Sequence, residues 1–415
     1  MNIVFLSPIG SIGGAERVLL HLFDAIGRSF PDSRRTLIQF GDGPLADEAE
    51  RRGVRVIVES APKTFASVGD TRLRHAAGRT IGAAETGVAL ARAVPQIYSL
   101  ASRLRRRLRA LRPTVVHSNG IKTHLLARLA APRRAARVLH LHDFLSNRPL
   151  VRRAAPFLAA SAARGIAVSN AVAEDVNRIA PSLPLSVILN AVDTDHFSPG
   201  FSDGAFLDRE SGLPSAEPGI LRVGLVATYA EWKGHAVFLK AISMTPNVRG
   251  YIVGGPIYAT TGSQVTLDEL KRTANSLGLR DRVGFLPFQS DTRDIYRSLD
   301  VVVHASTRPE PFGLTIAEAM SVGKPVVVAA AGGAVELFED GVSAVGYSPG
   351  DAEGLSGRIS ALVNDHETRK RIGVAARVRA LDRFSMQRFS REVAETFASL
   401  RTTVAPADRR TARTR

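Results

Sequence analysis

Short apolar runs that end at glycines or polar residues recur along the chain, and each predicts a buried β-strand. In the first half these runs cover residues 2–8, 36–40, 54–58, 114–117, 137–142, 165–170 and 186–189. In the second half they cover residues 221–227, 251–253, 283–286, 301–303 and 326–328. Segments with helical spacing of apolar residues lie between them, such as 15–22 and 171–179. This alternation predicts an α/β protein with two doubly wound sheets that face each other across a cleft.

The composition limits the size, chemistry and location of the protein. A chain of 415 residues exceeds what one hydrophobic core usually supports, so we expect two domains. The absence of cysteine excludes disulfides, thiolate metal sites and a cysteine nucleophile. The first ten residues have no basic region and too short an apolar run for a signal peptide, and no later segment is predicted to span a bilayer. We therefore expect a cytoplasmic protein.

The net charge of +16 is concentrated in one part of the first half. Residues 60–165 contain 20 Lys and Arg against three acidic residues, which gives +17. Within this region a helix is predicted from Pro95, with an apolar stripe of Ile97, Ala101, Leu104, Leu108 and Leu111. Its other faces carry Arg103, Arg105, Arg106, Arg107 and Arg109. Contact with an anionic membrane surface and an ordinary solvated basic face both remain open. Nucleic acid is disfavoured, because no aromatic residues interleave these charges.

Two further segments lack a clear pattern of buried elements. Residues 61–87 are rich in Gly and Ala and predict a mobile loop or short helices. The Arg-rich residues 404–415 predict a disordered tail.

The stretch over residues 306–333 predicts a site for a sugar that carries a phosphate. It follows a buried strand and contains a helix from Gly313, whose start offers the backbone N–H groups of Phe312, Gly313, Leu314 and Thr315 to an anion. Glu310 lies at the mouth of this site, between two prolines, and Glu318 about one turn into the helix can reach back beside it. Carboxylates are poor phosphate ligands but good acceptors for sugar hydroxyls. The alternative is an ordinary Rossmann-like unit with a helix-capping glutamate.

Glu310 and Glu318, with seven residues between them inside EPFGLTIAEAM and followed by GKPVV and AGG, resemble the signature of the GT-B glycosyltransferases of retaining family four. This resemblance implies that Glu310 contacts hydroxyls of the donor sugar, that Glu318 contacts the ribose, and that the amides between them contact the sugar and the diphosphate. It also implies two Rossmann-like domains facing a central cleft. We expect them at residues 1–195 and 196–380, with a helix over residues 381–403 that crosses back onto the first domain.

Other motifs fit the same resemblance. Gly13 and Gly14 stand in a G-x-x-G-G turn, which differs from the dinucleotide fingerprint and disfavours a nicotinamide enzyme. In the resembled family this turn approaches the donor diphosphate and the acceptor. Lys233 matches the lysine that contacts the phosphates, but Thr228 stands where the family usually has an arginine. His117 and His142, each near the end of a strand, are candidates for the family's histidine that contacts the donor sugar and the phosphate region.

No metal site is expected in this chain. Asp193-Thr194-Asp195 spells a D-x-D sequence, which binds a divalent metal in another transferase fold. Here it lies in the segment that connects the two halves, beside Pro199 and a stretch with Gly and Ser, so we interpret it as turn and linker chemistry.

These features predict a metal-independent glycosyltransferase that moves a sugar from a UDP-, GDP- or similar nucleotide sugar to a glycan or lipid-linked acceptor, with retention of configuration. No cofactor is expected. The basic region predicts attachment to an anionic membrane surface, such as the inner face of the plasma membrane. Two alternatives remain: a nucleotide-sugar epimerase or phosphorylase of the same fold, and a nucleotide-sugar-binding homologue without turnover. Thr228 is the feature that favours the second.

Overall fold

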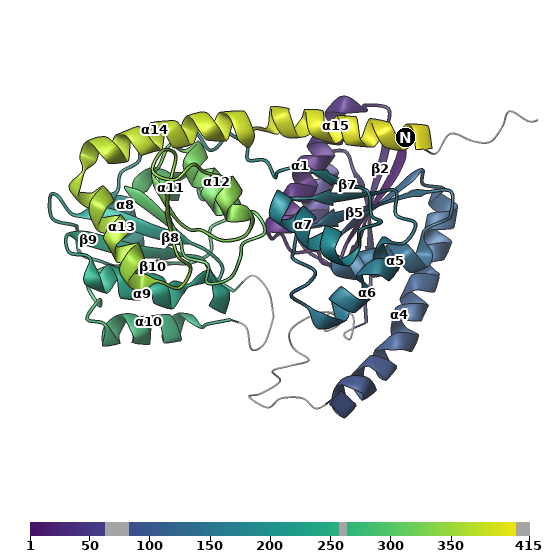
Figure 1. Ribbon diagram of the computed structural model, residues 1–415, viewed down its shortest axis with the longest axis horizontal. Coiled ribbons are helices and arrows are strands. Elements are labelled where there is room, and N and C mark those ends of the chain that lie inside the picture. Colours follow the sequence, from purple (N-terminus) through teal and green to yellow (C-terminus); the bar gives the residue numbers. More distant parts are fainter. Residues whose placement is uncertain (63–82, 257–263, 404–415) are drawn as a thin grey trace, which may run out of the picture. The chain divides into compact units, whose positions relative to one another are not determined.

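The computed structural model describes residues 1–62, 83–256 and 264–403 (Figure 1). Residues 63–82, 257–263 and 404–415 are outside this description. Most of the loop expected at residues 61–87 and the whole tail expected to be disordered, 404–415, therefore lie outside the described residues.

Contacts within the chain divide it into two compact units. The first unit contains Met1–Val168, Val172–Ile188 and the chain from Phe389 onward, and the second contains Ser169–Ala171 and Leu189–Arg388. The boundary expected between residues 195 and 196 thus falls a few residues inside the second unit.

The first unit is built on a parallel sheet of seven strands in the order β3-β2-β1-β4-β5-β6-β7. The strands are β1 Asn2–Ser7, β2 Arg34–Phe40, β3 Arg55–Glu59, β4 Val115–Asn119, β5 Ala136–Leu141, β6 Arg164–Ala167 and β7 Leu185–Val187. The helices of this part are α1 Gly14–Ser29, α2 Leu45–Arg51, α4 Ala83–Leu111, α5 Ile121–Ala130, α6 Pro149–Ala159, α7 Asn170–Ile179 and α15 Met386–Thr403.

The second unit is built on a parallel sheet of six strands in the order β10-β9-β8-β11-β12-β13. The strands are β8 Leu221–Val226, β9 Val248–Val253, β10 Val283–Leu286, β11 Val301–His304, β12 Val326–Ala329 and β13 Val345–Tyr347. The α-helices are α8 Ala205–Ser211, α9 His235–Met244, α10 Leu267–Ser276, α11 Arg293–Ser298, α12 Leu314–Ser321, α13 Ala352–Asn364 and α14 His366–Arg383. Two short 3₁₀ turns, η2 Glu231–Lys233 and η3 Gly333–Glu336, complete it.

The central strands are buried, which explains their continuous apolar runs. Val4 and Leu6 of β1 and Val116 of β4 belong to the core of the first unit, and Val223 and Val303 belong to that of the second. The sequence prediction of two doubly wound parallel α/β units is confirmed.

In each sheet the strand order reverses direction next to the strand that comes first in the sequence. β1 lies between β2 and β4, and β8 lies between β9 and β11. Ligands of open α/β sheets bind outside the carboxyl ends of the strands at such a switch point. The loops after β1 and β4 in the first unit, and after β8 and β11 in the second, are therefore the places to look for a site.

Two helix predictions were wrong in their bounds. The helix predicted from Pro95 begins at Ala83, with Pro95 inside it. Pro95 itself is exposed, and α4 packs on the core of the first unit through Leu100, Leu104 and Leu108. The single helix predicted over residues 381–403 is divided into α14, which ends at Arg383, and α15, which begins at Met386.

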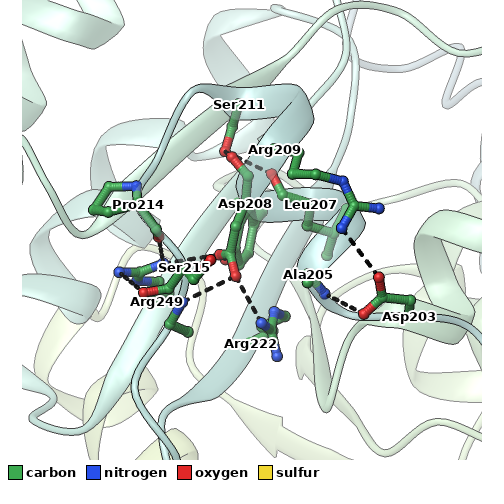
Figure 2. Close-up of polar contacts among 12 residues, drawn as sticks. Asp203, Ala205, Leu207, Asp208, Arg209, Ser211, Pro214, Ser215, Arg222 and Arg249 are labelled. Atoms are coloured by element: carbon green, nitrogen blue, oxygen red, sulfur yellow. Dashed lines mark hydrogen bonds and ion pairs between the residues drawn. The ribbon is translucent and has the colours of Figure 1, made fainter.

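A buried network ties α8 to strands β8 and β9 of the second sheet (Figure 2). The Asp208 carboxylate, 1% exposed, accepts hydrogen bonds from Arg222 Nη2 at 2.7 Å, Arg249 Nη1 at 2.9 Å and Ala216 N at 3.2 Å, and also from the Tyr251 hydroxyl. Burial raises the pKa of Asp208, but these donors outweigh it and lower that pKa to about 2. The network is a structural link between α8, β8 and β9.

Candidate active site

An ion pair lies at the switch point of the second sheet. Lys233 ends the 3₁₀ turn after β8, and Glu310 lies on the loop after β11. The Lys233 Nζ donates to Glu310 Oε2 at 2.7 Å, and the two side chains are 23% and 14% exposed. The structure therefore brings these two predicted residues together at the expected edge of the sheet.

Two more side chains hold the Glu310 carboxylate. His304 Nε2 lies 3.2 Å from Oε2, and the Ser306 hydroxyl donates to the same oxygen at 2.8 Å. Burial raises the pKa of Glu310, but Lys233 and His304 outweigh it and hold that pKa well below its usual range. All these bonds go to Oε2, and within the described chain no hydrogen bond to Oε1 is found. The ionised carboxylate thus keeps one oxygen available to a ligand.

The glycines of the motif allow the loops around Glu310 to approach each other closely. The backbone of Glu310 pairs with residues 331–333, and Gly333 N donates to Glu310 O at 2.7 Å. A Cβ on Gly333 would lie 2.1 Å from Pro311 O. A Cβ on Gly234, directly after Lys233, would lie 1.8 Å from Ala305 O, and Gly234 has a φ of 72°. Side chains at either glycine would force the loops apart.

The start of α12 offers backbone donors next to this pair. Gly313, with a φ of 107°, caps the helix and begins it in a conformation that favours glycine. Ile316 N and Ala317 N donate to Gly313 O. In the described parts of the chain, the amides of Phe312, Gly313, Leu314 and Thr315 donate to no protein acceptor. This group suits an anion, as the sequence predicts, and its contact with a diphosphate stays a prediction.

Glu318 of α12 is held by a residue of a second helix. Its carboxylate is buried and accepts a hydrogen bond from the Tyr296 hydroxyl of α11 at 2.9 Å. The expectation that this side chain reaches back beside Glu310 stays a prediction, and the structure adds that Tyr296 holds the carboxylate. Its predicted contact with the ribose remains untested.

Thr228 lies on the same loop as Lys233, directly beyond β8. Its carbonyl accepts from Ala230 N at 2.7 Å, and the residue is half-buried. The position therefore belongs to the candidate site, but its side chain has no positive charge with which to replace an arginine.

The switch point of the first unit contains Gly13 and Gly14 at the start of α1. Gly13 N donates to Glu16 Oε2 at 3.1 Å, and Arg17 N donates to Gly13 O at 3.0 Å, so that Glu16 stabilises the turn. Burial raises the pKa of the Glu16 carboxyl to about 7. The contact of this turn with a diphosphate stays a prediction.

His142, directly after β5, is the histidine that the structure places at this edge. It is half-buried, and its Nε2 lies 2.7 Å from Asn119 Oδ1 at the end of β4. The Asn119 Nδ2 donates to the Ala15 carbonyl of α1 at 3.3 Å. Asn119 thus joins His142 to the glycine turn.

His117 lies inside the core instead. It is fully buried and packs against Phe5, His140 and Phe397, with ring centroids 5.4, 5.2 and 6.4 Å away. Neither ring nitrogen has a hydrogen-bond partner among the described residues, and burial lowers the pKa of His117 to about 3. This placement gives His117 a packing role and does not support its assignment as a residue that contacts the donor.

Several residues of the site were missed from the sequence. His304, Ser306 and Asn119 all lie at or just beyond the carboxyl end of a strand, which is the signal that could have identified them. Tyr296 gave no such signal, because it looks like an ordinary apolar position of a short helix.

The D-x-D sequence forms a turn. Asp193 Oδ1 accepts hydrogen bonds from Asp195 N at 3.1 Å and His196 N at 3.0 Å. Within residues 1–62, 83–256 and 264–403, no group of three His, Asp or Glu side chains is placed to hold a metal ion.

The basic residues of α4 are partly engaged with the first unit itself. Arg103 donates to Ser60 O at 3.0 Å, Arg107 pairs with Glu59 at 2.8 Å, and Arg105 donates to Leu129 O. Of the helices in the described ranges, none has the length and apolar character needed to cross a bilayer.

Comparison with known families finds two matches that together extend over both units. The family Glycosyltransferase Family 4 matches residues 43–196, and the family Glycosyl transferases group 1 matches residues 209–379. The second match contains Lys233, Glu310 and the start of α12.

Individual proteins agree with these families. A D-inositol 3-phosphate glycosyltransferase of Mycolicibacterium smegmatis is 38% identical over 173 residues, which is 40% of this chain and 38% of that protein. The match thus spans well under half the length of this curated relative.

Solved structures match almost the whole chain. The Anabaena protein HepE, solved with UDP and glucose, is 27% identical with a TM-score of 0.78, covering 96% of this chain and all of that one. Sucrose-phosphate synthase of Thermosynechococcus elongatus shares the fold at 16% identity, with a TM-score of 0.76 over 97% of this chain and 100% of its own. The chain therefore belongs to the group 1, family 4 glycosyltransferases, and its two parallel-sheet units have the GT-B fold.

Proposed function

We propose that this protein transfers a sugar from a nucleoside-diphosphate sugar to a hydroxyl group of an acceptor. The observation that carries this proposal is the Lys233–Glu310 pair at the switch point of the second sheet. It combines a cation for a diphosphate with a carboxylate for sugar hydroxyls, next to the donor amides of α12.

The chemistry follows from the charge that develops when the donor breaks. The bond between the anomeric carbon and the diphosphate oxygen breaks, and its electron pair stays on that oxygen. The Lys233 ammonium and the amides at Phe312, Gly313, Leu314 and Thr315 stabilise the resulting negative charge. The free Oε1 of Glu310 accepts hydrogen bonds from sugar hydroxyls, which orients the ring.

We further propose that the reaction retains the anomeric configuration and needs no metal. The acceptor oxygen attacks the anomeric carbon from the face that the diphosphate leaves, and its proton passes to the departing phosphate oxygen. This route needs no protein nucleophile, and the carboxylate of Glu310 is held by Lys233 and Ser306. The Asp193 carboxylate of the D-x-D sequence accepts backbone hydrogen bonds in a turn, which supports a metal-independent reaction.

The relatives indicate which donor and acceptor to test first. HepE was solved in complex with UDP-glucose, so UDP-glucose is the first donor to test. For the acceptor we propose a glycan or lipid-linked hydroxyl, and the names of the mycobacterial relatives add inositol phosphate to the acceptors that a panel should contain.

We also propose that the first unit attaches to an anionic membrane surface. On α6 the exposed apolar side chains Leu150 and Phe157 lie among the exposed Arg152 and Arg153. Apolar and basic residues on one helix suit a lipid interface, where each basic residue contributes about 1 kcal/mol. Co-sedimentation with vesicles of graded anionic content tests this. Binding should weaken with salt and when Arg152 and Arg153 become Gln, and salt-independent or absent binding would reject it.

A binding protein without turnover is the second candidate, and Thr228 favours it. Without the arginine usual at this position, the diphosphate loses one positive contact. An epimerase or phosphorylase of the same fold is distinguished by its products, since neither forms a glycoside from a nucleotide sugar and an acceptor hydroxyl.

The test is to incubate the full chain with UDP- and GDP-sugars and to measure release of the nucleoside diphosphate, with and without glycan, lipid-linked and inositol-phosphate acceptors. The proposal predicts release that an acceptor accelerates, and a glycoside whose anomeric configuration by NMR equals that of the donor. Tight binding of the nucleotide with no release would instead support the binding protein.

A further inference from the structure

The hydrogen bonds around Asn119 determine how its amide is oriented. Asn119 is 1% exposed, and one end of its side chain lies 3.3 Å from the Ala15 carbonyl oxygen. A carbonyl oxygen only accepts hydrogen bonds, so the Asn119 NH₂ group must face it. The Asn119 oxygen Oδ1 therefore faces His142.

This orientation determines the protonation of His142. Oδ1 of Asn119 can only accept, and it lies 2.7 Å from His142 Nε2, so that Nε2 must carry a hydrogen. Burial lowers the pKa of His142, which keeps the ring neutral at pH 7. A neutral imidazole with hydrogen on Nε2 has a lone pair on Nδ1. Within the described residues, no donor occupies that lone pair.

The surroundings keep the ring in this position. The His142 ring lies against that of His140, with centroids 4.1 Å apart. Ala15 belongs to the first turn of α1, directly after Gly13 and Gly14. One buried amide thus connects the ring to the turn at the switch point of this sheet.

We propose that Asn119 is a positioning residue that fixes His142 in its neutral Nε2–H tautomer, so that Nδ1 accepts a hydrogen bond from a substrate hydroxyl and does not contact a phosphate. A lone pair repels phosphate oxygens, whereas it attracts a hydroxyl hydrogen. The hydroxyl ligand rests on the proposed function, while the tautomer does not. Of the two contacts expected at His142, to the donor sugar and to the phosphate region, the tautomer set by Asn119 favours the first and excludes a hydrogen bond from Nδ1 to a phosphate oxygen.

The tautomer is measured on the substrate-free full chain with ¹⁵N-labelled histidine, by two-bond ¹H–¹⁵N spectra of the rings at pH 7. The signal of His142 is assigned by its loss in His142→Gln. The proposal predicts a single neutral form with hydrogen on Nε2. A ring with hydrogen on Nδ1, or a cationic ring, would overturn it.

Two substitutions separate the roles of Asn119. Asn119→Leu removes the acceptor and should allow the Nδ1–H form to become populated. Asn119→Asp keeps an acceptor and should keep the hydrogen on Nε2; because its negative charge raises the pKa of His142, this variant is measured at a pH at which the ring is neutral. Ser118→Ala is the matched control, because it breaks a neighbouring buried 2.7 Å contact to a different ring, His124. It should leave the His142 signal unchanged. An unchanged single form in Asn119→Leu would show that Asn119 does not fix the ring.

The hydroxyl contact is tested with UDP and UDP-glucose. In His142→Gln the affinity for UDP should stay within about twofold, while turnover of UDP-glucose falls roughly 10²-fold, as expected for a misplaced reacting group. An equal loss of affinity for UDP would place His142 on the phosphates and reject the hydroxyl contact. If the wild type has the predicted tautomer but turns over no nucleotide sugar, the proposed function fails and the assignment of Asn119 stands.

Discussion

Lys233 Nζ donates to Glu310 Oε2 across 2.7 Å, although 77 residues separate the two in the chain. Each residue comes from the loop after one of two neighbouring strands, β8 and β11, between which the order of the sheet reverses. The loops that follow parallel strands lie at the same carboxyl edge of the sheet, so the strand order brings Lys233 and Glu310 close together. In the proposed function Lys233 contacts the diphosphate and Glu310 contacts the sugar hydroxyls, and the predictions below test the pair and the residues that support it.

Gly333→Ala should reduce transfer of sugar by about 10²-fold while the protein stays folded, since a misplacement of the catalytic loop by about 1 Å has an effect of that size. The new Cβ would lie 2.1 Å from Pro311 O and would push the Glu310 loop out of place. Initial rates with UDP-glucose measure this. The control is Gly357→Ala in α13, where a Cβ meets nothing within 4 Å. It should leave the rate unchanged and add about 0.5–1 kcal/mol of stability. Equal rates in all three proteins would contradict our assignment of the loop.

Asp208→Asn should lower the free energy of unfolding by about 3 kcal/mol, because it leaves Arg222 and Arg249 partly buried without their counter-charge (Figure 2). Urea unfolding at pH 7 measures the change. Asp203→Asn is the control, since its ion pair with Arg209 is exposed at 3.1 Å. It should have little effect. If Asp203→Asn lowers the free energy of unfolding as much as Asp208→Asn does, the burial of the Asp208 network does not explain its contribution to stability.

Stability should fall as the pH is lowered from 6.5, because buried histidines of the first unit resist protonation. Burial lowers the pKa of His117 and of His124 to about 3, whereas an unfolded histidine has a pKa of about 6.5. Between these values the unfolded chain binds protons that the folded chain does not. Each such histidine therefore removes up to about 1.4 kcal/mol of stability per pH unit in that window, and its contribution is fully present only above pH 6.5.

His117→Phe removes one of these titrations and should make the loss of stability between pH 7 and pH 5 less steep. Urea unfolding at the two pH values measures the slope. Phe397→Leu alters the same packing contact without removing a titration, so it should lower stability equally at both values. A slope in His117→Phe equal to that of the wild type would reject this account.

Asp195→Asn should leave transfer unaffected, and the wild type should keep its rate in chelator. Asp193, the other carboxylate of the D-x-D sequence, accepts two backbone hydrogen bonds in its turn. Rates with and without EDTA measure this dependence. Loss of activity in chelator, restored by a divalent cation, would show that a metal takes part.

Local sequence patterns predicted much of this structure, because parallel strands that are buried on both faces have continuous apolar sequences. The strand predicted at residues 283–286 has the bounds of β10, and the family and fold that the EPFGLTIAEAM motif implied are confirmed. The start of α4 could not be predicted in this way, because a proline such as Pro95 is locally typical of a helix start. The break between α14 and α15 was not predicted either.

Side-chain partners were harder to predict than elements. His117 and Asn119 are two residues apart on β4, so their side chains lie on the same face of the sheet. The alternation does not predict which of the two is covered by aromatic residues from other elements. The structure shows that Phe5 and Phe397 cover His117, while Asn119 reaches His142. Likewise, the hydrogen bond from Tyr296 to Glu318 joins two helices whose packing no local pattern specifies.

The most direct test of the central claim is the rate at which UDP is released from UDP-glucose by the wild type, Glu310→Gln and Lys233→Ala. Asp203→Asn serves as a control of the same unit. If Lys233 stabilises the departing diphosphate and Glu310 orients the sugar, each site variant should lose about 10² or more in kcat while it remains folded by circular dichroism, and the control should keep its rate. Near-normal rates in either site variant would contradict the assignment of the Lys233–Glu310 pair as the centre of the reaction.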